Sequence, residues 1–174
     1  METATKALPG LAVLEQTPII IEKIIHTATN EQLHWKPSME RWSISEILAH
    51  LADTEDAAFR QRIKKMSEEN SPLLESYDQN AVYKAGKYAG RAQEHLKNFC
   101  HERDRTLSWL RYLPAGVLSR TGTHQEFGSI TVAHLMNEWA LHDMGHIRQI
   151  LEVYRAHAFY PHMGAFQKGY KLNP

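Results

Sequence analysis

The sequence lacks three features that would each define a class of protein. It has a single cysteine, Cys100, so no disulfide can form within the chain. No stretch approaches the roughly 20 apolar residues that a membrane-spanning helix needs. The N-terminus has no uninterrupted apolar core after a basic segment, so we expect no secretory signal. Together these absences predict a cytoplasmic protein in a reducing setting, with no membrane partner.

An excess of charge of one sign is also missing. Lysine plus arginine number 20, as do aspartate plus glutamate, so the formal net charge is zero. The densest basic cluster, between Arg60 and Lys65, is followed at once by Glu68 and Glu69. Binding to nucleic acid would need a basic excess or a basic stripe, so we expect no nucleic-acid partner.

What remains is the composition of an ordinary globular protein. The chain has 174 residues, of which 43% are hydrophobic, enough for one domain with one core. It contains neither a repeat of fixed period nor a low-complexity tract. We therefore predict a single domain over residues 1–174.

Apolar residues recur at helical spacing in four segments. Thr17 and Pro18 are typical of a helix start, as N-cap and first residue. Ser43 and Glu46 fit a capping box that opens a second helix, which continues to about Met66. A third helix is predicted over about 89–112, and a fourth from residue 129 or 131 to about 157.

The connections between these segments are predicted to be irregular. Residues 73–90 form a looser region, and residues 118–129 are predicted to be a loop with at most a short extended piece. No alternation of period two is strong enough to predict a sheet. Four helices of these lengths predict an all-α protein with the architecture of a four-helix bundle.

Histidine is the residue type that suggests chemistry. There are eleven, and the pair His142 and His146 stands out in the middle of the fourth helix. Residues four apart lie on one helix face, about 5–6 Å apart at Cβ, which suits two imidazoles on one metal ion. Leu135, Trp139 and Val153 share that face, so the pair points inward. The alternative is that each imidazole is hydrogen-bonded separately. His50, amid the apolar residues of the second helix, could be a third ligand or an ordinary core histidine.

A zinc protease is a rival interpretation of the pair. His-Asp-x-x-His differs from His-Glu-x-x-His in that Asp143 stands where the general base would be, one methylene shorter. Gln149 and Glu152 occupy the positions of the glycine and third histidine of one protease class. We therefore reject this interpretation and expect Asp143, which points about 100° away from His142, to serve packing or an ion pair.

Two segments resemble the motifs of a known family, the DinB-like metal-binding bundles. Residues 42–55, WSISEILAHLADTE, resemble its first motif. Thr131 and Val132, leading to residues 142–150, HDMGHIRQI, resemble its second. The resemblance covers nearly the whole chain, with the motifs in order on the expected helices.

The resemblance implies a bundle with an up-down-down-up course and three metal ligands, His50, His142 and His146. It implies a divalent metal ion, nickel or zinc first, with manganese or iron as alternatives. It also implies a homodimer. Family members with known activity transfer or hydrolyse groups with low-molecular-weight thiols, so the expected partner is a small-molecule substrate and possibly such a thiol.

Three protein ligands leave a coordination position for water or substrate, which is the catalytic pattern. Glu138, Gln149 and Asp53 lie within about a turn of the histidines and are candidates to orient an imidazole through its free nitrogen. We thus expect a metal-dependent thiol S-transferase or hydrolase. The alternative is a non-enzymatic protein in which the metal is structural or sensory. The C-terminal segment 160–164 could cover the mouth of the site, but we expect it to pack without touching the metal.

Overall fold

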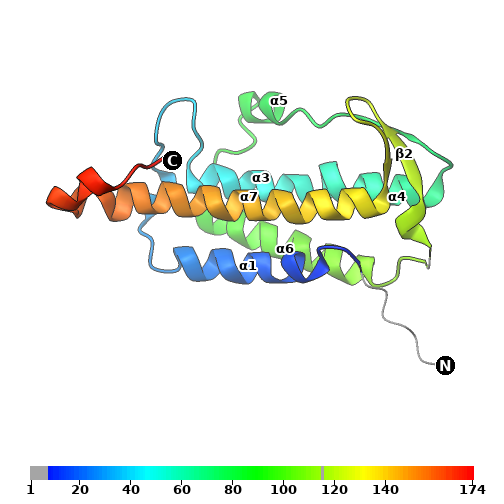
Figure 1. Cartoon of the computed structure of the whole chain (residues 1–174), viewed down its shortest axis with the longest axis horizontal. Coiled ribbons are helices and arrows are strands. Elements are labelled where there is room, and N and C mark those ends of the chain that lie inside the picture. Colours follow the sequence, from blue (N-terminus) through cyan, green and yellow to red (C-terminus); the bar gives the residue numbers. More distant parts are fainter. Residues whose placement is uncertain (1–7, 115) are drawn as a thin grey trace.

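The computed structural model describes residues 8–114 and 116–174 and is built from four long helical segments (Figure 1). The segments are α1 (Leu11–Ile25), the continuous run of α3 (Ile44–Thr54), a π-helical turn (Glu55–Arg60) and α4 (Gln61–Glu68), then α6 (Ala92–Leu110) and α7 (Val132–Ala158). Short helices are α2 (Asn30–His34), α5 (Gln79–Lys84), and 3-10 turns at Val117–Ser119, Tyr160–His162 and Gly164–Gly169. The strands are β1 (Leu73–Leu74), β2 (Thr121–His124) and β3 (Gly128–Thr131).

The four segments follow the up-down-down-up course of the DinB-like bundle. In Figure 1, α1 and α7 run in one direction, whereas α3–α4 and α6 run in the other. Because α4 and α6 are parallel, the chain must return along the bundle between them, and residues 69–91 make this crossover with β1 and α5. The all-α prediction of a four-helix bundle is confirmed, and the long crossover places residues 77–88 over α3.

The predicted start of the first helix is wrong. Helix α1 begins at Leu11, and Pro18 lies inside it. A proline within a helix has no N–H to donate to the carbonyl four residues earlier, here that of Leu14. Nη1 of Arg103 donates to this carbonyl oxygen at 2.7 Å. A side chain from α6 thus compensates for the missing bond, and the helix continues through the proline.

The second helix starts where the capping box predicts. The Ser43 hydroxyl accepts from the backbone N–H of Glu46, and the Glu46 carboxylate accepts from the backbone N–H of Ser43. The π-helical turn at Glu55–Arg60 was not predicted. Glu55 lies in this turn with 1% of its surface exposed, where it meets Arg103 of α6. The third and fourth helices lie within three residues of their predicted bounds.

A small sheet corrects the prediction that the chain has none. Strand β2 pairs in parallel with β1 and antiparallel with β3. The strands have two, four and four residues, too few for a period of two to stand out in the sequence. Gly122 of β2 is required by packing, because a Cβ there would lie 2.9 Å from the Leu74 side chain. The sheet closes one end of the bundle beside α4 and α7 (Figure 1).

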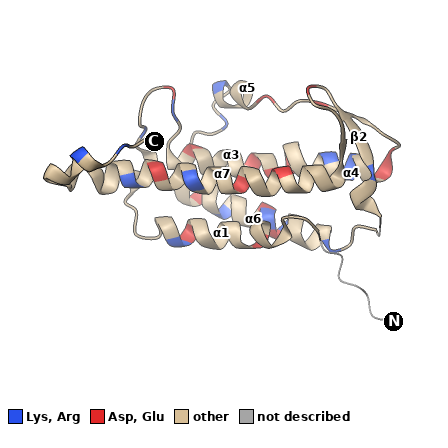
Figure 2. Cartoon of the chain, viewed as in Figure 1, with Lys and Arg blue, Asp and Glu red and all other residues tan. Residues whose placement is uncertain are grey.

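Two groups of buried apolar residues fill the bundle, one toward each end. Trp139 and Phe59 stack in the first, with ring centroids 4.5 Å apart and planes at 7°. Ile47, Leu51 and Ile150 belong to the second. Charged side chains of both signs alternate over the outside of the helices (Figure 2). Among the described residues, no helix combines the length and apolar character needed to cross a membrane.

Candidate metal centre

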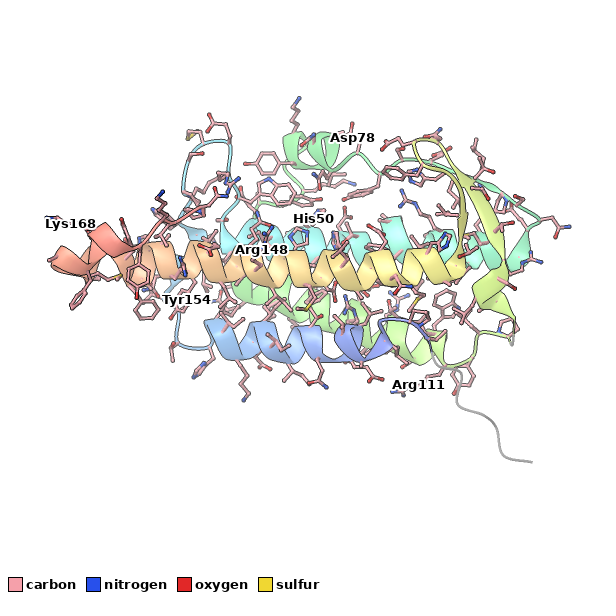
Figure 3. All side chains as sticks on the ribbon, in the orientation of Figure 1. His50, Asp78, Arg111, Arg148, Tyr154 and Lys168 are labelled. Carbon is pink, nitrogen blue, oxygen red and sulfur yellow. The ribbon has the colours of Figure 1, made fainter. Side chains whose placement is uncertain are left out.

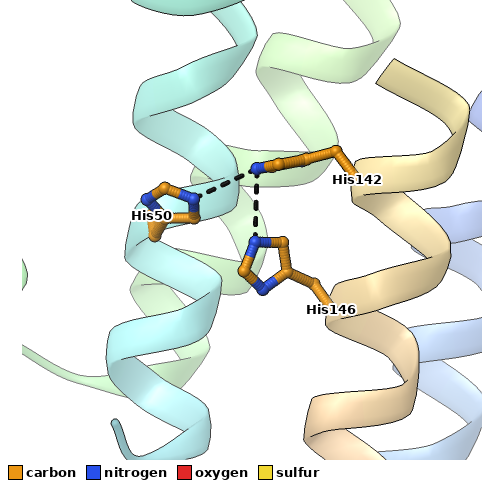
Figure 4. A group of neighbouring side chains, drawn as sticks. All are labelled: His50, His142 and His146. Atoms are coloured by element: carbon orange, nitrogen blue, oxygen red, sulfur yellow. Dashed lines mark hydrogen bonds between the residues drawn. The ribbon is translucent and has the colours of Figure 1, made fainter. Parts of the chain in front are cut away.

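Three histidines from two helices meet between the two halves of the core (Figure 4). His50 comes from α3, and His142 and His146 come from α7. Nε2 of His142 lies 3.2 Å from Nε2 of His50 and 3.2 Å from Nε2 of His146. One ligand atom from each residue lies within 4.8 Å of the others. The structure therefore brings together the three histidines that the sequence motifs select.

The helices explain the convergence. His142 and His146 are four residues apart on α7, so their rings project from one face with centroids 4.4 Å apart. His50 faces them from α3 and is only 2% exposed, whereas the other two are partly exposed. The ring of Trp42, just before the capping box, lies 5.0 Å from that of His50 and covers it. One side of the cluster is thus closed and the other is open.

Gln149 determines the tautomer of His146. Nδ1 of His146 lies 2.9 Å from Oε1 of Gln149, one turn along α7. An amide oxygen only accepts hydrogen bonds, so Nδ1 carries the proton. In the neutral ring Nε2 then presents a lone pair to the centre of the cluster. Of the three predicted orienting residues, Gln149 is the one that contacts a histidine directly in this way.

A chain of hydroxyl groups determines the tautomer of His50. The Tyr77 hydroxyl donates to Asp53, whose carboxylate can only accept. The oxygen of Tyr77 is then the acceptor for the Tyr88 hydroxyl, 2.8 Å away. Tyr88 in turn accepts from Nδ1 of His50 at 3.0 Å. Asp53 therefore orients His50 through two tyrosines, and Nε2 of His50 also presents a lone pair to the centre.

His142 differs from the other two histidines. Within residues 8–114 and 116–174, its buried Nδ1 has no hydrogen-bond partner, and Oδ1 of Asp143 lies 4.0 Å away. Asp143 is fully buried, and its Oδ2 lies 2.7 Å from Nη1 of Arg103. The predicted ion pair of Asp143 is therefore confirmed. Burial by itself would raise the pKa of Asp143, but the nearby imidazole of His142, together with the positive charge and hydrogen bonds of Arg103, lowers it. The carboxylate is therefore negatively charged beside His142.

Burial keeps His50 and His146 neutral at physiological pH. Desolvation, followed by the proximity of His146 and His142, lowers the pKa of His50 to about 2. Desolvation, followed by the proximity of His142, lowers the pKa of His146 to about 4. Neutral imidazole is the form that binds a metal ion, so these two rings are in the ligand state without any further deprotonation.

The donor set fits a divalent cation. With metal–nitrogen bonds of about 2.0–2.1 Å, tetrahedral ligand nitrogens lie about 3.3 Å apart, close to the two distances of 3.2 Å found here. Nε2 of His142 has at most one proton to share between the lone pairs of His50 and His146, so one linear hydrogen bond cannot account for both contacts. A shared cation would satisfy all three, and imidazole suits zinc, nickel, copper and iron alike.

Two cavities adjoin the cluster, and His142 lines both. One, of about 170 Å³, extends toward the sheet and is also lined by His50, Arg62 and Glu138. The other, of about 490 Å³, is lined by His146, Gln149 and residues of the loop before α3. Desolvation raises the pKa of Glu138, although His142 and Arg62 act to lower it. Glu138 thus lines the smaller cavity, and within the part of the chain that the structure describes it forms no hydrogen bond with the three histidines.

Tyr77 and Tyr88 are the residues that sequence reasoning missed. Both lie in the crossover, in the region predicted to be loose, and no local pattern links them to a histidine. Residues 160–164 of the C-terminal tail are not among the lining residues of these two cavities. Farther along, however, Asn173 reaches the larger cavity.

Comparisons with known proteins agree with this fold. Residues 14–150 match the family model of the DinB superfamily. A protein of Oceanobacillus iheyensis named "Putative metal-dependent hydrolase" is 26% identical over 137 residues, which are 79% of each chain. The solved structure of YfiT from Bacillus subtilis, described as a probable metal-dependent hydrolase with an unusual four-helix bundle topology, matches with a TM-score of 0.76. The match has 22% identity and covers 90% of this chain and 91% of YfiT.

Proposed function

This chain belongs to the DinB superfamily, and we propose that it is a metal-dependent enzyme that hydrolyses a small molecule. The observation that carries the proposal is the convergence of three Nε2 atoms, two of them with their Nδ1 protons held by Tyr88 and Gln149. We assign His50, His142 and His146 as ligands of nickel or zinc, with manganese or iron as alternatives. The names of both relatives support a hydrolytic, metal-dependent reaction.

The proposed chemistry is divided between the ion and the chain. A divalent ion on three imidazoles keeps a coordination position for water or substrate and lowers the pKa of a bound water or thiol. The carboxylate of Glu138 lines the smaller cavity beside His142, where it can take up a proton, and desolvation raises its pKa above the ordinary value for glutamate. We assign Glu138 as the general base.

A thiol S-transferase is the second candidate, favoured by the two cavities that share His142. A transfer reaction needs room for two reactants on one centre, and a low-molecular-weight thiol in one cavity could meet an electrophile in the other. The Asp53–Tyr77–Tyr88–His50 chain and Gln149 would keep the imidazoles in place during either reaction.

The test is turnover by protein of known metal content. Protein loaded with nickel or zinc is assayed with para-nitrophenyl acetate, and separately with a low-molecular-weight thiol plus chlorodinitrobenzene. We expect one bound ion for each chain and metal-dependent turnover in at least one assay. The bound ion and the turnover should both be lost in His142→Ala. Both should be kept in His101→Ala, which removes an exposed imidazole of α6. Stoichiometric metal with no turnover of a broad substrate panel would refute the enzyme and favour a structural or sensory ion.

A further inference from the structure

The larger cavity beside the histidines has a basic rim. Arg148 follows His146 on α7 (Figure 3), and Arg41 lies in the loop between α2 and α3. Both arginines line the cavity and both are exposed. Among residues 8–114 and 116–174, neither guanidinium has an ion pair with an acidic side chain. Glu152, the acidic residue of the lining, lies 3.1 Å from Arg155, which balances its charge. The cavity therefore carries positive charge in a protein whose net charge is zero.

Arg41 already holds oxygen acceptors at this rim. Its Nε donates to the backbone oxygen of Pro174 at 2.7 Å, and Nη2 donates to that of Asn173 at 3.3 Å. These two donors of Arg41 thus bind oxygens of the tail, and an anion at the mouth of the cavity would take the place of those oxygens. A carboxylate or phosphate presents oxygens in the geometry that such a pair of donors binds best.

Gly145 is a second, independent indication of a ligand. It lies in the middle of α7 between the two histidines, where glycine destabilises a helix relative to alanine. Packing does not require the glycine, because an added Cβ would have no heavy atom of the surrounding protein within 4 Å. Gly145 nevertheless lines the cavity. The missing side chain leaves room for a molecule to approach the helix between His142 and His146.

We infer that the substrate is a small organic molecule with a carboxylate or phosphate group, which Arg148 and Arg41 bind while its reacting group lies over Gly145 and the histidines. This inference rests on the proposed function for the reacting group, but the binding of the anion does not depend on it. A volume of about 490 Å³ suits a small molecule. A cationic substrate would be repelled from this rim, and a neutral one would leave the guanidinium of Arg148 without an anionic partner.

Binding is tested first, with succinate and inorganic phosphate as probes. Dissociation constants are measured by amide chemical shifts on the metal-loaded protein. We expect saturable shifts at Arg148 and Gly145, and an affinity about tenfold weaker in Arg148→Gln and in Arg41→Gln. Arg111→Gln is the matched control, because Arg111 is an exposed arginine at the end of α6, away from the cavity (Figure 3). Equal affinities in all four proteins would overturn the inference.

Turnover tests the inference separately from the proposed function. The ratio of kcat/KM for mono-para-nitrophenyl succinate to that for para-nitrophenyl acetate should fall about tenfold in Arg148→Gln and stay constant in Arg111→Gln. An unchanged ratio with both esters turned over would overturn the anion site and leave the hydrolase intact. No turnover of either ester, with succinate binding still weakened in Arg148→Gln, would count against the hydrolase and support the anion site.

Gly145→Ala separates ligand binding from folding. The added methyl group fills part of the cavity, so we expect weaker succinate binding and a higher KM for the anionic ester. The same change favours the helix and should raise the melting temperature by about 2 °C. A variant that is both more stable and poorer at binding shows that the glycine serves the ligand. Unchanged binding in Gly145→Ala would contradict the placement of the substrate over this position.

Discussion

The hydroxyl oxygen of Tyr88 lies 3.0 Å from Nδ1 of His50 and accepts a hydrogen bond from it. Tyr88 comes from the crossover and His50 from α3, so the long connection between the parallel helices α4 and α6 holds a proposed metal ligand in place. Burial raises the pKa of Tyr88 to about 12, although the hydrogen bond with Tyr77 acts to lower it. The group is therefore a neutral hydroxyl at physiological pH.

Removal of this hydroxyl should weaken metal binding. Tyr88→Phe keeps the ring and its edge contact with Trp42 but frees His50 to rotate and change tautomer. We expect a 10- to 100-fold loss of affinity, the usual range for partners of ligand histidines, measured by competition with a chelator. Tyr83→Phe is the control, because that hydroxyl contacts Lys36 and Glu46 instead. Equal affinities in the two variants would contradict the assigned role of Tyr88.

Replacement of Glu138 should remove proton transfer. Glu138→Gln keeps the size of the side chain but cannot accept the proton, so we expect kcat to fall by about 10²- to 10⁴-fold. Desolvation raises the pKa of Glu138, and the base is the ionised form. Wild-type kcat should therefore rise with pH through this raised pKa, and the rise should be absent in the variant. If the variant kept the same acidic limb, another group would be the base.

Metal-free protein should lose stability on acidification because of His50. The imidazole has a pKa of about 2 in the folded chain and 6.5 when unperturbed, and desolvation is the main cause of the difference. Below pH 6.5 the unfolded chain binds a proton that the folded chain does not. The contribution of His50 to the free energy of unfolding is therefore complete above pH 6.5. It is lost as the pH falls from 6.5 toward 2, by about 1.4 kcal/mol for each pH unit.

Urea unfolding of the metal-free protein between pH 7.5 and 5 measures this effect. The free energy of unfolding should fall less steeply in His50→Gln, which has no imidazole to titrate in either state. His101→Gln, at an exposed site, should keep the wild-type slope. Parallel slopes in wild type and His50→Gln would show that His50 is protonated in the folded protein at these pH values.

Arg103 should be essential to the stability of the fold. Its guanidinium is fully buried and donates to Glu55, Asp143 and the carbonyl oxygen of Leu14. Arg103→Met leaves two carboxyl groups buried without their partner, and we expect a loss of about 3–5 kcal/mol in urea unfolding. Arg60→Met breaks ion pairs with the more exposed Asp56 and Glu102 and should cost about 1 kcal/mol or less. Similar losses would contradict the central role of Arg103.

The sequence by itself determined the features that depend on neighbours along the chain. The capping box of Ser43 and Glu46 lies within one turn, and the shared face of His142 and His146 follows from the helical repeat alone. The course of the bundle and the choice of His50 came from a resemblance of motifs, since no local pattern distinguishes His50 from an ordinary core histidine.

Only the tertiary structure decided the features that join distant segments. By local rules Pro18 marks the start of a helix, yet α1 begins at Leu11 and continues through the proline, because Arg103 from the distant helix α6 supplies the donor that proline lacks. Asp53 is linked to His50 through Tyr77 and Tyr88 because the crossover folds over α3. Arg41 meets Arg148 at one cavity because the loop before α3 folds over α7. Such contacts depend on packing across the bundle, for which the local sequence carries no periodic signal.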